Sequence, residues 1–262
     1  MKAPLISIIT VVYNCVSSIE ETILSVINQT YSNLEYIIID GGSTDGTIDI
    51  IKKYKHAITL WVSEPDKGVY DAMNKGIDRA NGEWINFMNA GDNFFNNNVL
   101  FDIFSQDISY KTSIIYGDTL QCFSCGRFMT KPEELVHLNK HMIFCHQSAF
   151  VRRSLLQQYY FDTTYRICAD YNLFYNLYKD GLKFQYIPLC IAIYDASDGI
   201  SSINRLEVLK EESKINSISS IEYFNSYIKN RTRACLSKIL PRKIFNIILG
   251  KWSVSKKHLY IE

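Results

Sequence analysis

One tract constrains the fold of this chain more than any other. Four apolar residues, Tyr36 to Ile39, run directly into Asp40 and the pair Gly41-Gly42. A strand without alternating polar positions is buried on both faces, as in a parallel sheet covered by helices. Ligands of such open α/β sheets bind where the carboxyl ends of the strands open into a crevice. We therefore expect Asp40 to face a ligand rather than the core, and a polar residue within 43–45 to cap a helix that begins near Thr47.

Strand and helix patterns alternate at short intervals in the first third of the chain. A capping box, Ser17 with Glu20, predicts the start of the first helix. The first strand leads into Tyr13-Asn14-Cys15, so neither a dinucleotide fingerprint nor a phosphate loop follows it. Strands are predicted at 5–12, 34–39, 58–62 and 84–88, and helices at 17–28, 47–54 and 69–80. This pattern predicts a nucleotide-binding α/β half over residues 1–92.

The order loosens after Asp92. Helices are predicted at 96–104 and 169–179, strands at 113–116 and 184–187, and short polar turns between 117 and 150. We expect residues 93–204 to handle a second substrate. Further helical patterns, at 205–230 and 243–251, predict a helical extension over residues 205–262.

Composition limits the class of protein. With 262 residues, 47% hydrophobic and 21% charged, the chain has the make-up of a soluble globular protein. No apolar run approaches the roughly 20 residues that span a bilayer, and the first residues lack a targeting segment. Seven scattered cysteines favour reduced thiols over a disulfide framework. These features predict a cytoplasmic protein.

The net charge of +1 hides a strongly basic end of the chain. Residues 229–257 hold nine Lys and Arg and no acidic residue, interleaved with apolar residues. This pattern is typical of interfacial helices that bind an anionic membrane surface, here the cytoplasmic face of the inner membrane. The alternative is a helix packed on the catalytic domain with a solvated basic face. A nucleic-acid partner is disfavoured because this segment has few interleaved aromatic residues and the rest of the chain is acidic.

A second apolar strand, Trp84 to Met88, also ends in small residues and a carboxylate, Asn89-Ala90-Gly91-Asp92. Oxygen ligands presented in this way suit a hard divalent cation that bridges a diphosphate. With this feature the chain resembles the family 2 glycosyltransferases of the GT-A fold over residues 4–201. Five blocks in order carry the resemblance: Ser7–Asn14, Asp40–Thr47, Glu64–Gly76, Asn89–Asp92 and Ala169-Asp170.

The resemblance implies a mixed, mainly parallel central sheet flanked by helices. It also implies roles for individual residues. Asp40 accepts a hydrogen bond from the uracil ring, and Asp92 holds Mn²⁺ or Mg²⁺ on the sugar diphosphate. The remaining nucleotide-sugar contacts are implied at Thr10, Val12, Tyr13, Asp66, Asn74, Lys75, Asn89, Ala90, Gly91 and His146, although His146 is as readily a hydrogen-bonded structural residue.

Asp170 resembles the general base that deprotonates the acceptor hydroxyl in a single, inverting displacement. The chain departs from the commoner family pattern at three positions, where Asn89, Gly91 and Ala169 replace acidic residues. Metal binding then rests on Asp92, the diphosphate and water. For both Asp92 and Asp170 a helix N-cap is the alternative role.

The implied reaction moves a sugar from a nucleotide sugar, a UDP-sugar by analogy, to a saccharide acceptor. The family analogy and the basic segment favour a lipid-linked acceptor in bacterial polysaccharide, O-antigen or lipopolysaccharide synthesis. Two alternatives stay open. One is a sugar-nucleotide nucleotidyltransferase, which would need a basic Gly-rich loop after the first strand. The other is a non-catalytic module that holds structural zinc at Cys122, Cys125, His137 and His141; a loop or hairpin with reduced thiols is the simpler interpretation of that segment.

Overall fold

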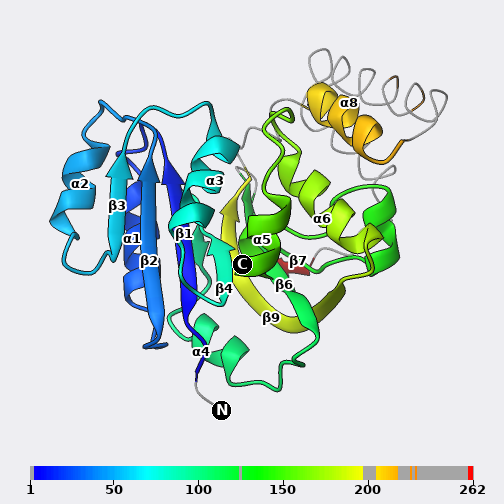
Figure 1. The fold of residues 1–262 in the computed structure, drawn as a ribbon, viewed down its shortest axis with the longest axis horizontal. Helices are drawn as coiled ribbons and strands as arrows, with labels where there is room; N and C mark the ends of the chain where they lie inside the picture. Colours follow the sequence, from blue (N-terminus) through cyan, green and yellow to red (C-terminus); the bar gives the residue numbers. More distant parts are fainter. Residues whose placement is uncertain are drawn as a thin grey trace.

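The chain folds into a central β-sheet with helices on both faces (Figure 1). A computed structural model describes residues 3–123, 126–196, 205–217, 225, 228 and 259–261 of the 262-residue chain. In the described residues no helix is long and apolar enough to cross a membrane.

The first half alternates strands and helices as predicted. The strands are β1 (Ile6–Val12), β2 (Leu34–Asp40), β3 (Leu60–Ser63) and β4 (Trp84–Phe87), and the helices between them are α1 (Ile19–Ile27), α2 (Thr47–Lys53) and α3 (Val69–Arg79). They form the parallel order β4-β1-β2-β3. β1 and β2 are apolar and buried because helices cover both faces of the sheet.

The second half continues the sheet with mostly antiparallel ladders. Its elements are β5 (Asn93–Phe94), α4 (Val99–Phe104), β6 (Thr112–Phe123), β7 (Gly126–Thr130), the 3₁₀ helices η1 (Leu135–Asn139) and η2 (His146–Ser148), β8 (Ala149–Arg152), α5 (Arg153–Tyr159), α6 (Ala169–Lys179), β9 (Lys183–Asp195), α8 (Arg205–Ile215) and β10 (Leu259–Ile261). β8 lies antiparallel to both β4 and β6, whereas β9 runs parallel to β6. The sheet is therefore mixed, as predicted, and "mainly parallel" describes its first half only.

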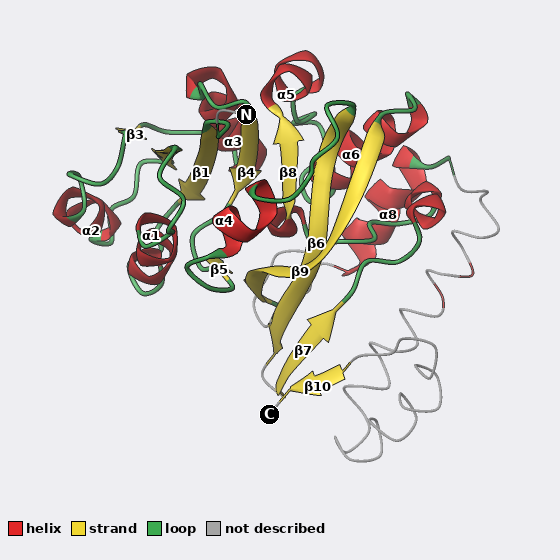
Figure 2. Ribbon diagram, turned by 90° about the horizontal axis from the view of Figure 1, so that it is seen from below, coloured by secondary structure: helices red, strands yellow, loops and turns green. Residues whose placement is uncertain are grey.

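Two apolar clusters fill the space between the sheet and its helices. Ile9 and Val11 of β1 face the cluster with α3, α5, α6 and α8, while Ile6 and Ile8 face the cluster with α1, α2 and α4. This alternation follows from the two-residue period of a strand. Figure 2 shows the sheet between the two helical layers, with β7 and β10 as the strands at its far edge.

The structure differs from the sequence prediction in three elements. The capping box is wrong, because Ser18 is the N-cap of α1 and Glu20 instead accepts hydrogen bonds from Lys53 and Tyr54 of α2. β6 and β9 are far longer than the predicted 113–116 and 184–187, because they pair with each other through irregular register shifts. The extension is not helical throughout, because Leu259–Ile261 form a strand that pairs with β7.

Candidate active site

The carboxyl ends of the first strands meet at one edge of the sheet. Val12 lies opposite Asp40, and Asp40 lies opposite Ser63. The loop after β4 joins them, because the Ala90 N–H donates to the Val11 carbonyl at 3.2 Å. The loops that follow β1, β2, β3 and β4 therefore surround one crevice, as the sequence predicted.

The side chain of Asp40 is fully buried in the loop that follows it. Its carboxylate accepts hydrogen bonds from the N–H groups of Gly42 and Ser43 and from the hydroxyls of Ser43 and Ser63. Gly42 has φ +88°, a conformation that favours glycine and turns the loop back over the carboxylate. The expectation that Asp40 faces a ligand is wrong in this structure, since its own loop uses both oxygens.

The same loop holds the segment after β1 in place. The Asn14 N–H donates to Ser43 Oγ at 2.7 Å, and the Thr44 N–H donates to Asn14 Oδ1 at 2.9 Å. Asp45 accepts the N–H of Thr47 at 3.0 Å, but the N-cap of α2 is Gly46, so the predicted cap from within 43–45 is one residue early. These contacts present Tyr13, 63% exposed, at the crevice.

A cavity of about 1300 Å³ opens between this edge and the second half of the chain. It brings together eight of the predicted site residues: Val12, Tyr13, Asn89, Ala90, Gly91, Asp92, His146 and Asp170.

Three other predicted residues serve the scaffold. Thr10 is fully buried and donates to the Met88 carbonyl at 2.7 Å, so its side chain does not line the nucleotide crevice. Asn74 both donates to and accepts from the backbone of Phe161 at 2.9 Å. Lys75 donates to the Pro65 carbonyl at 2.9 Å and pairs with Glu64. These placements correct the prediction that all three border the nucleotide. Asp66 is half-buried at the end of the loop that Lys75 holds.

Asp92 is buried at the wall of the cavity, 6% exposed, and accepts a hydrogen bond from Gln147 Nε2 at 2.8 Å. Burial raises the pKa of Asp92 from its ordinary value of 3.8 to about 6, although hydrogen bonds from Gln147 and from the Asp195 backbone partly oppose this effect. Gly91 has φ +100°, so a glycine rather than the acidic residue of the commoner pattern suits the turn. Asp92 is thus a carboxylate with a poorly compensated charge.

The loop residues fit a hard divalent cation. Asn89 Oδ1 is buried and has no hydrogen-bond partner among the described residues. It lies three positions before Asp92 on the same loop, and both line the cavity. An amide oxygen and an ionised carboxylate are ligands that Mg²⁺ and Mn²⁺ accept.

Asp170, the second residue of α6, lies beside three polar groups, one of which, the Tyr70 hydroxyl, donates its single hydrogen over the shorter distance of 2.5 Å to the Ile167 carbonyl. Its Oδ2 lies 3.1 Å from His146 Nδ1, and its Oδ1 accepts the Tyr171 N–H at 2.8 Å and lies 3.2 Å from the Tyr70 hydroxyl. Burial raises the pKa of Tyr70 well above its ordinary value, so this hydroxyl remains a donor. The carboxylate is therefore held in a fixed orientation with about a fifth of its side chain exposed.

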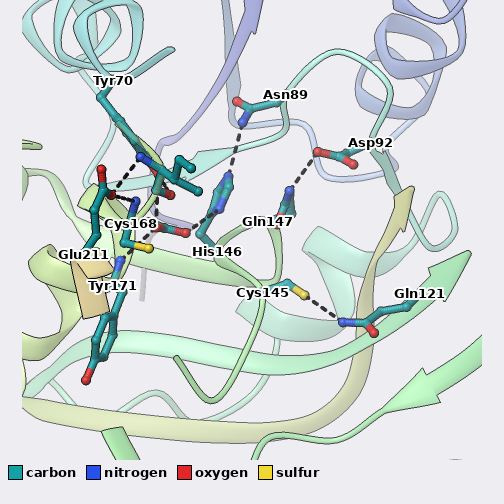
Figure 3. Close-up of polar contacts among 12 residues, drawn as sticks. Tyr70, Asn89, Asp92, Gln121, Cys145, His146, Gln147, Cys168, Tyr171 and Glu211 are labelled. Atoms are coloured by element: carbon teal, nitrogen blue, oxygen red, sulfur yellow. Dashed lines mark hydrogen bonds and ion pairs between the residues drawn. The ribbon is translucent and has the colours of Figure 1, made fainter. Parts of the chain in front are cut away.

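His146 connects Asp170 to the loop after β4, and Figure 3 shows its contact with Asn89 of that loop. Its Nε2 lies 3.2 Å from Asn89 Nδ2. A neutral imidazole satisfies both contacts, with Nε2 accepting from the amide and Nδ1–H donating to Asp170. This tautomer is assigned from the contacts rather than observed.

Sequence reasoning missed the carboxylate that supports the segment before Asp170. Glu211 of α8 accepts the N–H groups of Arg166, Ile167 and Cys168 at 2.8, 3.0 and 2.8 Å. These three residues lead directly into α6, so Glu211 holds the segment that positions Asp170. No local pattern signals a contact across more than 40 residues. Gln147 follows His146 in a segment that the sequence marked as a candidate contact, but no local pattern signals its hydrogen bond to Asp92, 55 positions away.

Two other predictions fall partly outside the described residues. Cys125 and the basic segment 229–257 lie there, so zinc binding and the membrane helices stay predictions. Cys122 belongs to the β6–β7 hairpin, and His137 and His141 each lie 3.2 Å from Glu133 Oε2. Within the described ranges no group of three or more His, Cys, Asp or Glu residues is placed to hold a metal ion, and all five described cysteines are free thiols.

The sequence profile described as glycosyl transferase family 2 matches residues 7–175. The chain belongs to this family. The match covers both halves of the cavity and every predicted site residue, and it decides against the nucleotidyltransferase and the non-catalytic module.

Relatives and solved structures agree with this family and with the GT-A fold. A PGL/p-HBAD biosynthesis glycosyltransferase of Mycobacterium bovis is 29% identical over 77% of this chain and 81% of its own. An uncharacterized glycosyltransferase of Haemophilus influenzae is 40% identical over 35% of this chain and 38% of its own. Staphylococcus aureus TarS residues 1–349, solved with UDP, aligns with a TM-score of 0.64 at 17% identity over 84% of this chain and 68% of that one. The mannosyltransferase PcManGT of Pyrobaculum calidifontis, solved with GDP-Man and Mn²⁺, aligns with a TM-score of 0.64 at 16% identity over 96% and 80%.

The raised pKa of Asp92 predicts a stability effect with a defined sign. The folded carboxyl keeps its proton up to about pH 6, whereas the unfolded one loses it near 3.8, so the free energy of unfolding falls as pH rises through this window. Asp92→Asn, which mimics the protonated form, should therefore stabilise the metal-free protein at pH 7.5 by on the order of 1–3 kcal/mol. Thermal unfolding in chelator measures this gain, which should shrink as pH falls towards 4. A less stable Asn variant at pH 7.5 would contradict the assignment.

The Glu211 contacts predict that a change at this residue lowers turnover without weakening donor binding. Glu211→Ala frees the segment before Asp170 and should lower kcat by about 10- to 100-fold with little change in donor KM. Glu211→Gln keeps acceptor oxygen and should recover part of the loss. Glu207→Ala is the matched control, because Glu207 is exposed on the same helix and its ion pair among the described residues is with Lys210 of that helix. Equal kcat values for the two alanine variants would remove Glu211 from this role.

Proposed function

We propose that this glycosyltransferase transfers a sugar from a UDP-sugar to a hydroxyl of a saccharide acceptor with inversion at the anomeric carbon. One observation carries the proposal: Asp92 and Asp170 line the same cavity, one on the sheet side and one on the helix side. The UDP complex of TarS supports the choice of nucleotide. At 17% identity, the TarS structure shares the fold with this chain and does not itself establish the donor.

Asp92 and Asn89 are the residues that would hold Mn²⁺ or Mg²⁺. When bound, the cation neutralises the charge that builds on the departing diphosphate. Gln147 orients the Asp92 carboxylate towards the cavity through its 2.8 Å hydrogen bond. Val12 and Tyr13, at the end of β1, line the nucleoside side of the cavity.

Asp170 acts as the general base in this proposal. Its contacts with His146, Tyr70 and the Tyr171 N–H fix the carboxylate while leaving part of it open to the acceptor hydroxyl. The carboxylate accepts the hydroxyl proton as that oxygen attacks the anomeric carbon from the side opposite the diphosphate. His146 already donates through Nδ1, so it orients the base rather than competing for the proton.

The experiment that tests this function compares variants at the two ends of α6. Asp170→Asn keeps the shape of the side chain but removes the base, so turnover of a UDP-sugar should fall by about 10²- to 10⁴-fold while UDP affinity is unchanged. Asp180→Asn, at the exposed C-cap of the same helix, is the control. Chelator should abolish turnover by the unmodified enzyme, and Mn²⁺ or Mg²⁺ should restore it. Full turnover by Asp170→Asn would disprove the assignment of Asp170 as the general base.

The proposal includes a lipid-linked acceptor in bacterial polysaccharide or O-antigen assembly, met at the cytoplasmic face of the membrane. The basic, apolar-interleaved segment 229–257 supports this choice, because such segments bind anionic lipid surfaces. The mycobacterial relative, named for PGL/p-HBAD biosynthesis, gives weaker support.

Membrane binding has its own test. Each basic residue near an anionic surface contributes roughly 1 kcal/mol, so the full-length protein should sediment with anionic vesicles and less so at high salt. A variant with the nine basic residues of 229–257 changed to Gln keeps chain length and should lose binding. Neutral vesicles are the control. Equal sedimentation of both proteins would contradict the membrane role.

A further inference from the structure

The nucleotide crevice needs a carboxylate other than Asp40. Both carboxylate oxygens of Asp40 accept hydrogen bonds from its own loop or from Ser63, and the side chain has no exposed surface. A base N–H could reach this carboxylate only by breaking the turn that shapes the crevice.

Asp66 lies next to the open side of the same turn. A Cβ built on Gly41 would fall 2.4 Å from Asp66 Oδ2 and 3.3 Å from Tyr13 Cδ2. The Asp66 carboxylate and the Tyr13 ring therefore both border the space that a side chain at position 41 would fill. Asp66 Oδ1 accepts the Gly68 N–H at 2.8 Å, and no contact within the described residues occupies Oδ2.

The loop that carries Asp66 is well anchored. The Glu64 N–H donates to the Asp40 carbonyl at 3.0 Å, and Lys75 Nζ donates to the Pro65 carbonyl at 2.9 Å. The Lys67 N–H donates to Asp71 Oδ2 at 3.1 Å. These contacts fix Asp66 on both sides, so its carboxylate is preorganised and loses little side-chain freedom on binding.

We propose that Asp66, in place of Asp40, is the carboxylate that reads the base of the donor. Its Oδ2 accepts the ring N3–H of uracil while the exposed face of Tyr13 stacks on the ring. This inference rests on the UDP-sugar proposed above. It implies selection against cytosine, whose N3 is an acceptor and would meet the carboxylate lone pairs.

Gly41 contributes to the same base-binding site because it has no side chain. The 2.4 Å separation equals that between Cβ and an Oδ atom within one aspartate side chain, so an Asp at position 41 can place an oxygen where Asp66 Oδ2 now lies. The φ of Gly41 is not in the left-handed region, so the backbone there accepts a side chain. Gly41 thus leaves the room that Asp66 uses.

The test is a calorimetric comparison of UDP, N3-methyl-UDP and CDP. Asp66→Ala should weaken UDP binding by about 10- to 100-fold. It should not weaken N3-methyl-UDP or CDP, since neither ligand has an N3–H to lose, and CDP binding should strengthen because the repulsion between its N3 and the carboxylate is removed. Gly41→Asp in the Asp66→Ala background should recover UDP affinity. Thermal unfolding checks that each variant folds.

Two results would overturn the assignment. One is an Asp66→Ala protein that binds UDP as tightly as the unmodified chain. The other is an equal loss for UDP and N3-methyl-UDP, which would indicate general damage to the loop. Failure of the unmodified protein to bind UDP is a different result, since it would contradict the proposed UDP-sugar donor and not the assignment of Asp66.

Discussion

The buried carboxylate of Asp40 is the interaction on which the nucleotide side of this enzyme depends. Hydrogen bonds to a charged acceptor contribute about 1.5–3 kcal/mol each, and a buried carboxylate without partners would be strongly unfavourable. The chain meets this demand with N–H and hydroxyl donors from its own turn and from Ser63. In return the turn takes one shape, and through Ser43 it fixes Asn14 and the position of Tyr13.

Strand ends could be predicted from the sequence, whereas the direction of their side chains could not. The apolar runs of β1, β2 and β4 located the crevice because burial on both faces leaves only the strand termini for polar chemistry. Whether Asp40 points out or back depends on the φ of Gly42, which no residue pattern specifies. The direction of the Thr10 side chain could not be predicted either, because its hydroxyl donates to the Met88 carbonyl 78 positions away.

The second half was predicted less well, because its order comes from long-range pairing. β6 and β9 contain polar residues and register shifts that break the two-residue alternation by which strands are recognised. α6 was predicted at its observed bounds, since its apolar residues follow the helical period and Asp180-Gly181 ends it. Asp170 was therefore placed correctly on the first turn of α6, but the Tyr70 contact with its side chain and the Glu211 contact with the segment before it come from elements remote in sequence.

The position of α8 bears on how members of this family are compared. The family match ends at residue 175, before α8 begins at Arg205. The carboxylate that holds the entrance of α6 is thus supplied from outside the shared region. Two relatives can share every residue of the matched region and still differ in the stiffness of the segment before Asp170. An alignment confined to the matched region carries no information on that stiffness. Turnover rates compared across such an alignment therefore reflect both the residues of the cavity and the support behind Asp170.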